Sequence, residues 1–315
     1  MNKLMTVVAA SVCAVSLSGS AVAAEDQAVE ADKEAAEAEE EESPMFEAGF
    51  DLDYFSAYVW RNAIQNDRQV IQPCVWADFT GLDPFWFGFS IWQNYDLTSR
   101  RRDVLKNALT ETDYNLHVGA TVWSNDAEDE SDEMSLDLEF GHEWFVNENV
   151  RKTDADARLS YADTRELYLK ATFNNPFVGV YGQTSWMYDD FGYAESGFHY
   201  ELGLTKEVEL VEDVLTLGAD WNVSFGDRNY LSYLFGDVHV REAGEDGEAV
   251  GHRPYGFGGT TVKAYLNWAI TDWMTLGGTI AYTGVLNGPV RDQLDEDGGY
   301  HRDYVWGGVS LKCAF

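Results

Sequence analysis

Apolar and polar residues alternate along much of the chain after Pro44. Tyr114 and Leu116, for example, alternate with Asn115 and His117. Successive side chains of a β-strand point to opposite faces, so this period of two predicts strands with one apolar and one polar face. No run of about 18 apolar residues follows Pro44, and a membrane-spanning helix is therefore not expected there.

Alternating segments of about ten residues recur often enough to suggest a barrel. Short turns separate some of them and long loops separate others, as in bacterial transmembrane barrels whose termini lie on one side. We therefore predict an all-β fold, a closed antiparallel transmembrane β-barrel of about 12 strands. The expected strands are 46–60, 69–80, 85–95, 110–123, 133–144, 164–173, 177–187, 197–206, 214–225, 260–270, 274–283 and 304–315. The register of the strand near 177–187 stays open.

A soluble β-sandwich also has alternating strands, so a second feature is needed to separate the two folds. Charged residues in the expected strands lie opposite the apolar stripe, apart from Arg165 and Lys206 at strand ends, where long side chains reach the interface. A sandwich would share that pattern. Large aromatic residues at both ends of the stripe favour a lipid-facing wall instead. These residues are Trp144, Phe225, Trp268 and Phe315.

Composition narrows the function classes. The 315-residue chain has 55 acidic and 21 basic residues and a formal net charge of −34, which argues against a nucleic-acid partner. Aromatic residues make up 14% of the chain, too many for a disordered acidic protein. We expect a folded protein with an acidic surface.

The N-terminal region predicts export. Residues 1–24 have the features of a signal peptide: Lys3, an apolar stretch and the small residues Ala21 and Ala23 around a cleavage site. Residues 25–43 form an acidic low-complexity segment, which is either a solvated periplasmic tail or a docking arm for a basic partner. The barrel is expected to span 44–315.

The last strand resembles the C-terminal strand of outer-membrane proteins. Val309, Leu311 and Cys313 alternate with polar or small residues up to a terminal Phe315. The resemblance implies that Phe315 is an assembly signal, recognised by the barrel-assembly machinery, and that the protein resides in the bacterial outer membrane.

The first hairpin resembles the start of TorF-like porins. The matching segments are Ser56-Ala57-Tyr58-Val59-Trp60-Arg61-Asn62, Gln72-Pro73 and Phe87-Gly88-Phe89-Ser90-Ile91-Trp92-Gln93-Asn94. Asn62 stands where the family pattern has Gly, and Asn tolerates the left-handed backbone geometry of such a turn. The resemblance covers about residues 50–94 and the final strand, and it implies an outer-membrane channel with no catalytic residues.

Acidic residues dominate the expected inner face. A water-filled lumen of this kind would draw cations, whereas a plugged interior would use the same side chains for internal hydrogen bonds. Loop 226–259 either folds inward to set the narrowest point or extends outside. The predicted pore-lining residues are Asp51, Asp53, Asp78, Asp113, Asp137, Glu139, Glu166, Glu201, Asp220, Lys170 and Lys263.

Enzymatic and metal-binding alternatives have less support. An outer-membrane hydrolase of lipase or protease type would need a Ser–His or Asp–His site, and His142 is expected at the lipid-facing rim. The six histidines lack any such signature. Residues 126–132 and 295–298 are acidic but lack the full spacing of an EF-hand, so we expect neither a metal nor a cofactor. Cys74 and Cys313 are expected to be free thiols on opposite faces.

The function predicted from sequence is therefore a porin-like channel for passive diffusion of small solutes, cation-leaning or neutral. The alternatives are a hydrolase and a structural barrel without flux. Arg100, Arg101 and Arg102 are expected to face lipopolysaccharide, because Arg binds phosphate through two hydrogen bonds. Outer-membrane lipid is thus an expected partner, and the choice between a monomer and a homo-oligomer stays open.

Overall fold

The fold is described from a computed structural model. It covers residues 45–97, 109–125, 133–147, 163–188, 196–235, 240–243, 249–252, 255–297 and 302–315. Twelve strands form one closed barrel: β1 (Phe46–Phe55), β4 (Val70–Leu82), β5 (Phe85–Asp96), β6 (Leu109–Ser124), β7 (Ser135–Asn147), β8 (Thr164–Asn174), β9 (Gly179–Tyr188), β10 (Gly197–Val211), β11 (Leu215–Gly226), β14 (Gly256–Thr271), β15 (Met274–Val285) and β16 (Asp303–Ala314).

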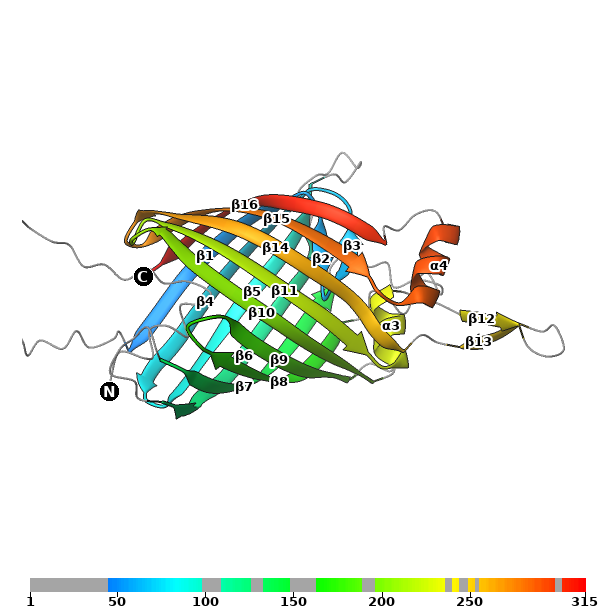
Figure 1. The fold of residues 1–315 in the computed structure, drawn as a ribbon, viewed down its shortest axis with the longest axis horizontal. Coiled ribbons are helices and arrows are strands. Elements are labelled where there is room, and N and C mark those ends of the chain that lie inside the picture. The colour runs from blue at the N-terminus through cyan, green and yellow to red at the C-terminus, as the bar shows by residue number, and fades with distance from the viewer. Residues whose placement is uncertain are drawn as a thin grey trace, which may run out of the picture.

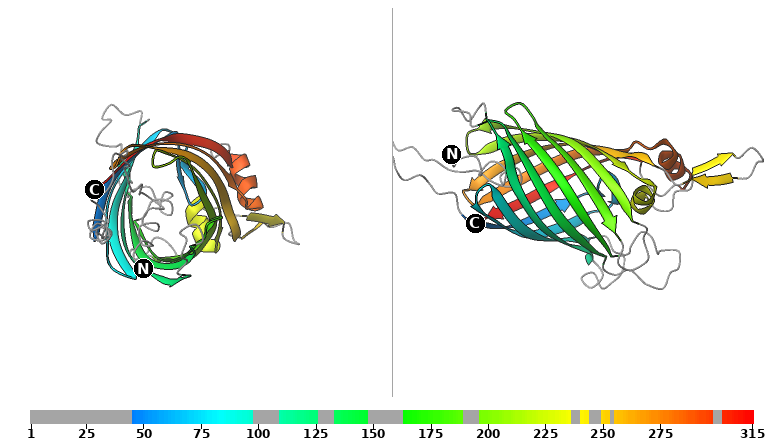
Figure 2. Two further views of the ribbon diagram at one scale, coloured as in Figure 1. Left: turned by 60° about the vertical axis from the view of Figure 1, so that its left-hand side comes forward. Right: turned by 90° about the horizontal axis from the view of Figure 1, so that it is seen from below.

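Each barrel strand pairs antiparallel with its neighbours in sequence, and the first strand pairs with the last. The closing seam runs from Gly49 opposite Ala314 to Phe55 opposite Gly308. Backbone hydrogen bonds in both directions between Ala48 and Phe315 extend the seam to the end of the chain. Figures 1 and 2 show the resulting tube of tilted strands. The predicted closed antiparallel barrel of 12 strands is therefore confirmed.

The two ends of the barrel differ. The described chain begins and ends at one end, which we call the termini end, where the turns between strands are short except for the one between β6 and β7 (Figure 1). The opposite, far end carries two helices, α3 (Arg228–Phe235) and α4 (Gly288–Asp297), and a projecting hairpin of β12 (Val240–Ala243) and β13 (Ala249–His252). Residues 295–297, expected in a solvated loop, thus end a helix.

The outer wall is apolar. Large side chains such as Phe87, Leu116, Phe140, Leu202 and Ile280 are exposed on it, at alternate positions of their strands. Side chains between these positions point into the barrel, because the strand period is two. Aromatic rings are exposed near both rims of the wall. Phe46, Phe85, Trp268, Trp273 and Phe315 lie near the termini end, whereas Trp144, Trp186, Phe198, Tyr200 and Phe257 lie near the far end.

The structure fixes the register of β9, which the sequence left open, and it agrees with the prediction for the two cysteines. In β9, Val180 and Trp186 are exposed on the outer wall, so Tyr181, Gln183 and Ser185 face inward, which fixes the register near 177–187. Cys74 and Cys313 are free thiols, as the sequence predicts. They lie on β4 and β16, which β1 separates.

One strand was predicted too long. The segment 46–60 is not a single strand: β1 ends at Phe55, and β2 (Tyr58–Trp60) leaves the wall to pair with β3 (Ala63–Asn66) in a separate two-stranded sheet. The physical reason is the small pair Ser56-Ala57, at which the chain turns inward and buries Ala57.

Several predicted segments lie outside the described residues: the signal peptide 1–24, the acidic tail 25–43, the loop arginines Arg100, Arg101 and Arg102, and the acidic turn 126–132. Within the described part of the chain, none of the helices is both long and apolar enough to cross a membrane.

Candidate functional site in the barrel interior

The β2–β3 hairpin crosses the bore of the barrel. On one side the Trp60 ring packs edge-on against Phe145 of β7, with ring centroids 5.3 Å apart. On the other side the turn meets β14, where the Asn62 amide nitrogen donates to the Gly259 carbonyl oxygen at 3.4 Å, and β3 contacts β15. Strands β7 and β15 are six strands apart in the ring of twelve and therefore face each other. The hairpin thus narrows the far half of the lumen.

The turn of this hairpin has unusual backbone geometry. Arg61 and Asn62 have positive φ values of 48° and 64°, between the paired residues Trp60 and Ala63. Two successive residues of this kind form a type I′ turn, which connects hairpin strands without splaying them. Asn is well suited to the left-handed region but Arg is not, at a cost of about 1–2 kcal/mol. Contacts of the Arg61 side chain must offset that cost.

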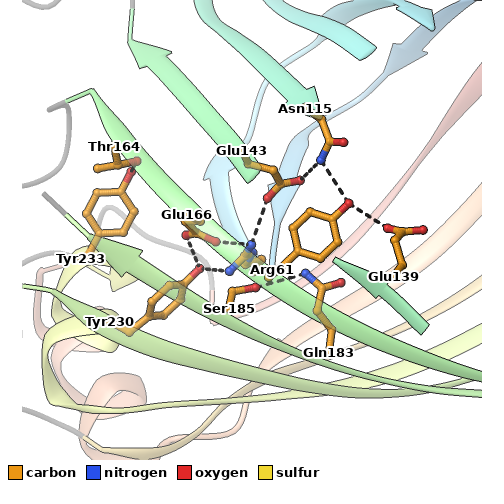
Figure 3. Close-up of polar contacts among 11 residues, drawn as sticks. Arg61, Asn115, Glu139, Glu143, Thr164, Glu166, Gln183, Ser185, Tyr230 and Tyr233 are labelled. Atoms are coloured by element: carbon orange, nitrogen blue, oxygen red, sulfur yellow. Dashed lines mark hydrogen bonds and ion pairs between the residues drawn. The ribbon is translucent and has the colours of Figure 1, made fainter. Parts of the chain in front are cut away.

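The Arg61 guanidinium is the centre of a buried polar cluster (Figure 3). Its Nη2 donates to Glu166 Oε2 at 2.5 Å and lies 3.4 Å from Glu143 Oε2, while Nη1 donates to the Tyr230 hydroxyl at 2.5 Å. The Tyr230 hydroxyl also lies 3.4 Å from Glu166 Oε1. Barrel strands β7 and β8 supply the two carboxylates, and helix α3 supplies the phenol. Three parts of the chain therefore meet at one guanidinium.

Burial strengthens the interactions between the charged groups of this cluster. The Glu166 side chain is 0% exposed and Arg61 only 8%, whereas Glu143 is 26% exposed and marks the side that opens towards the lumen. Burial disfavours the charged form of Arg61, but the carboxylates of Glu166 and Glu143 hold its pKa above the ordinary value. Burial raises the pKa of the Tyr230 phenol well above its usual range, so it acts as a neutral hydroxyl. The site is thus a fixed cation held by carboxylates.

Aromatic rings frame the guanidinium. Its central carbon lies 4.8 Å from the Trp60 ring centroid and 5.5 Å from that of Tyr230. The Tyr233 ring of α3 packs edge-on against Trp60, and Tyr58 packs against Trp92 of β5 at 5.5 Å. Faces of Trp and Tyr attract cations, most strongly where water is excluded. The aromatic frame and the carboxylates therefore both favour a flat cation at this position.

The lumen towards the termini end is more open and is lined by charged pairs. Lys263 of β14 bridges Asp220 of β11 at 2.6 Å, with both side chains part-exposed. His117 of β6 lies 3.0 Å from Asp78 of β4, over Gly88 of the strand between them. A side chain at Gly88 would collide with both partners. These pairs hold their charges against the inner wall.

Tyrosines hold interior glutamates in a repeating arrangement. The hydroxyls of Tyr168 and Tyr181 donate to Glu139 and Glu201, each at 2.7 Å. Each ring lies flat over a glycine of a neighbouring strand, Gly141 beneath Tyr168 and Gly203 beneath Tyr181. Tyr265 lies over Gly218 in the same way and donates to Glu207 at 2.7 Å. The carboxylates are therefore fixed in place along the inner wall.

The predicted pore-lining residues occupy inward positions of their strands, but they do not form one continuous lining. Asp137 is buried and accepts hydrogen bonds from Thr121 at 2.8 Å and Asn174 at 2.7 Å. Glu166 is buried by Arg61. The others are part-exposed on the inner face of the wall: Asp51, Asp53, Asp78, Asp113, Glu139, Glu201, Asp220, Lys170 and Lys263.

The sequence did not identify the residues at the centre of the site, Arg61, Trp60 and Tyr230. The sequence left open whether loop 226–259 folds inward or extends outside, and helix α3 in that loop buries Tyr230 and Leu234 at the far end. The hairpin was missed because its apolar alternation continues that of β1. Length gave no signal, because β6 and β14 are each 16 residues long and stay in the wall.

The histidines whose side chains are described have partners of other kinds. His142 bonds to the Tyr188 hydroxyl at 2.8 Å, and His117 bonds to Asn115 at 3.1 Å as well as pairing with Asp78. His199 stacks on Tyr230, with ring centroids 4.9 Å apart. No serine is among these partners. Within the described residues no group of three or more His, Cys, Asp or Glu side chains is placed to hold a metal ion.

Comparison with known proteins shows the barrel fold alone. No protein-family model matches the chain, and no curated protein does. Among solved structures, an outer membrane channel from Pseudomonas putida F1 is 10% identical, covers 87% of this chain and 97% of its own, and has a TM-score of 0.49. Outer membrane phospholipase A from Escherichia coli is 14% identical, with 84% and 92% covered and a TM-score of 0.43. The NanC porin is 8% identical, with 84% and 98% covered and a TM-score of 0.44. The function is therefore argued from the site.

Proposed function

We propose that the protein is a porin-like channel of the bacterial outer membrane, through which small cationic or neutral solutes diffuse passively. The observation that carries this proposal is the contrast between the two faces of the same strands: an apolar outer wall with aromatic rims, and an interior lined by ionised side chains. Lipid contact explains the first face and water the second.

The interior charge supports a preference for cations. Inward positions carry many acidic residues, and Lys263, one of the few lysines that oppose them, is already paired with Asp220. A lumen with a surplus of fixed carboxylates concentrates cations and repels anions. The pore-lining role of Asp51, Asp53, Asp78, Asp113, Glu139, Glu201 and Asp220 belongs to this proposal.

The hairpin across the bore limits the size of the solutes. It leaves the far half of the lumen narrow, because Ala57, Ala63 and Tyr230 around it are fully buried. We therefore expect a channel of low conductance that passes small ions and single small organic molecules.

Planar-bilayer recording tests this proposal. With a KCl gradient, the reversal potential should show that K⁺ permeates better than Cl⁻, and Asp220→Asn together with Glu201→Gln should reduce that preference. Liposome swelling with small sugars provides a second readout. Chloride preference, or the absence of any conductance from folded protein, would contradict the proposal.

The alternative functions predict different outcomes. A hydrolase would cleave ester or peptide substrates in detergent, and the partners of His117 and His142 do not favour this. A structural barrel would show neither hydrolysis nor flux. Both assays on the same folded sample separate the three functions.

Several expectations about the cell envelope extend this proposal. The termini end would face the periplasm, and Phe315, which is exposed and stacks on Trp273 at 5.9 Å beside the closing seam, would be read by the barrel-assembly machinery. The loop arginines Arg100, Arg101 and Arg102 would contact lipopolysaccharide phosphates. Arg61, in contrast, points into the barrel and is not available to lipid.

A further inference from the structure

The Arg61 cluster contains more carboxyl groups than Arg61 contacts. Glu143 and Glu166 contact the guanidinium directly, and Asp113 of β6 lies close enough to interact electrostatically with both glutamates and with Arg61. One arginine therefore serves three carboxyl groups. Asp113 Oδ1 is buried and has no hydrogen-bond partner among the described residues. The cluster thus keeps acceptor capacity for a cation that the chain does not supply.

The shape of the cluster selects among cations. Two carboxylates that meet one nitrogen of a planar group, with a hydroxyl at a second nitrogen and aromatic rings nearby, match a guanidinium, which donates several hydrogen bonds in one plane and stacks on rings. An ammonium or a metal ion is compact and cannot use both features. Arg61 shows that a guanidinium fits, since it meets Glu166, Tyr230 and Trp60 at once.

The position of Arg61 makes it replaceable. It lies at the tip of a hairpin whose two strands form a sheet separate from the barrel, and its backbone is in the disfavoured left-handed region. Glu143, by contrast, projects from a barrel strand and is part-exposed towards the lumen. A solute arriving from the lumen would therefore reach this carboxylate first.

We propose that this cluster is a binding site for guanidinium-bearing solutes, and that Arg61 occupies it as a tethered ligand when no solute is present. The inference deepens the proposed channel function, because passage through the lumen would bring such solutes to the site. Exchange of the solute guanidinium for that of Arg61 would loosen the hairpin at the narrowest part of the bore.

Saturation-transfer NMR on protein in detergent micelles tests binding without requiring flux. The probes are methylguanidinium, methylammonium and methylurea, which are alike in size but differ in charge and planarity. Arg61→Ala vacates the cluster, so this variant should bind methylguanidinium at least about tenfold more tightly than the native protein does, and more tightly than either other probe. Adding Glu166→Gln to Arg61→Ala should abolish the gain.

Arg165→Ala is the matched control. Arg165 also lies over a tryptophan, Trp144, at 5.0 Å, and it is the neighbour of Glu166 in the chain, but it points to the outer face. This variant should bind methylguanidinium no better than the native protein. Heat-dependent migration on gels reports whether each variant is folded. If Arg61→Ala does not fold, Arg61→Lys keeps the charge without the planar fork, and methylguanidinium should displace it at lower concentration than it displaces Arg61.

Channel recording separates failure of the site from failure of the channel. In Arg61→Ala, methylguanidinium should interrupt the KCl current in discrete events that methylurea does not produce. Equal binding of all three probes by Arg61→Ala would overturn the site, even if the channel conducts and prefers cations. Selective binding in a protein that never conducts would leave the site intact and refute the proposed function.

Discussion

The two halves of the barrel interior are built differently. The far half is filled: Tyr230, Met187, Glu166 and His199 are each almost completely buried around the β2–β3 hairpin and helix α3. The half near the termini keeps its charges part-exposed, as in the pair of Asp220 and Lys263, which are 24% and 36% exposed. The same wall therefore encloses a packed core towards one end and part-exposed charged side chains towards the other.

This difference indicates where stability and selectivity reside. A charge in the filled half is costly to leave without its partner, because water cannot reach it. A charge in the open half is solvated and screened, so its partner contributes little to stability but its field acts on passing ions. Mutations in the two halves should consequently change different measured quantities.

Removal of the hairpin should have the largest effect. Replacing residues 58–66 with a short Gly-Ser turn should raise single-channel conductance several-fold, because the hairpin spans the bore between opposite strands. Deleting residues 240–252 is the control, since β12 and β13 project beyond the far end (Figure 1). Unchanged conductance after hairpin replacement would show that the two halves are equally open.

Breaking the buried ion pair of Arg61 and Glu166 should have the second-largest effect. Glu166→Ala leaves Arg61 charged and buried, which should lower the unfolding free energy by about 3–5 kcal/mol. Asp220→Asn, in the open half, should cost no more than about 1 kcal/mol. Urea titration of the protein folded into lipid vesicles measures both. Similar losses for the two variants would remove the distinction between the halves.

Adding a methyl group to a closely packed glycine of the inner wall should have a smaller effect on stability. Gly203→Ala places a methyl group against the Tyr181 ring, and we expect a loss of about 1–3 kcal/mol in the same titration. At Gly278 an added methyl group meets open space, so Gly278→Ala should change stability by no more than about 0.5 kcal/mol. A tolerated Gly203→Ala would mean that Tyr181 does not lie firmly against the wall.

The turn itself should give the smallest effect. Asn62 adopts a positive φ, so Asn62→Ala should cost about 1 kcal/mol and Asn62→Gly should be nearly neutral. Hydrogen-exchange protection of the hairpin amides is the readout, because the change acts on the hairpin rather than on the wall. Equal protection in both variants would argue against a type I′ turn at this position.

The contrast between the barrel wall and the plug, which consists of the β2–β3 hairpin and helix α3, also separates what could be predicted from sequence from what could not. The wall follows from the period of two, which is local: alternation located all twelve strands, and the even number placed β1 against β16. The plug depends on distant contacts. Arg61 contacts three residues that are separated from it by 82, 105 and 169 positions in the chain, and no local pattern encodes such pairs.

The charged residues show the same division. Alternation placed Asp137 and Glu166 on the inner face, but it carried no information on depth or partners. Thr121 and Asn174 cover Asp137, and Arg61 covers Glu166. Whether an inward acid faces water is decided by what folds over it, which requires the three-dimensional structure.

The separation of the β2–β3 sheet from the barrel sheet has a consequence for cooperativity. The hairpin adds no strand to the ring, so each of the twelve barrel strands keeps both of its neighbours wherever the hairpin lies. Opening of the hairpin and unfolding of the wall would therefore be two distinct transitions with separate free energies. The exchange proposed for Arg61 would then widen the bore by breaking a few side-chain contacts, while the barrel wall remains one cooperative unit.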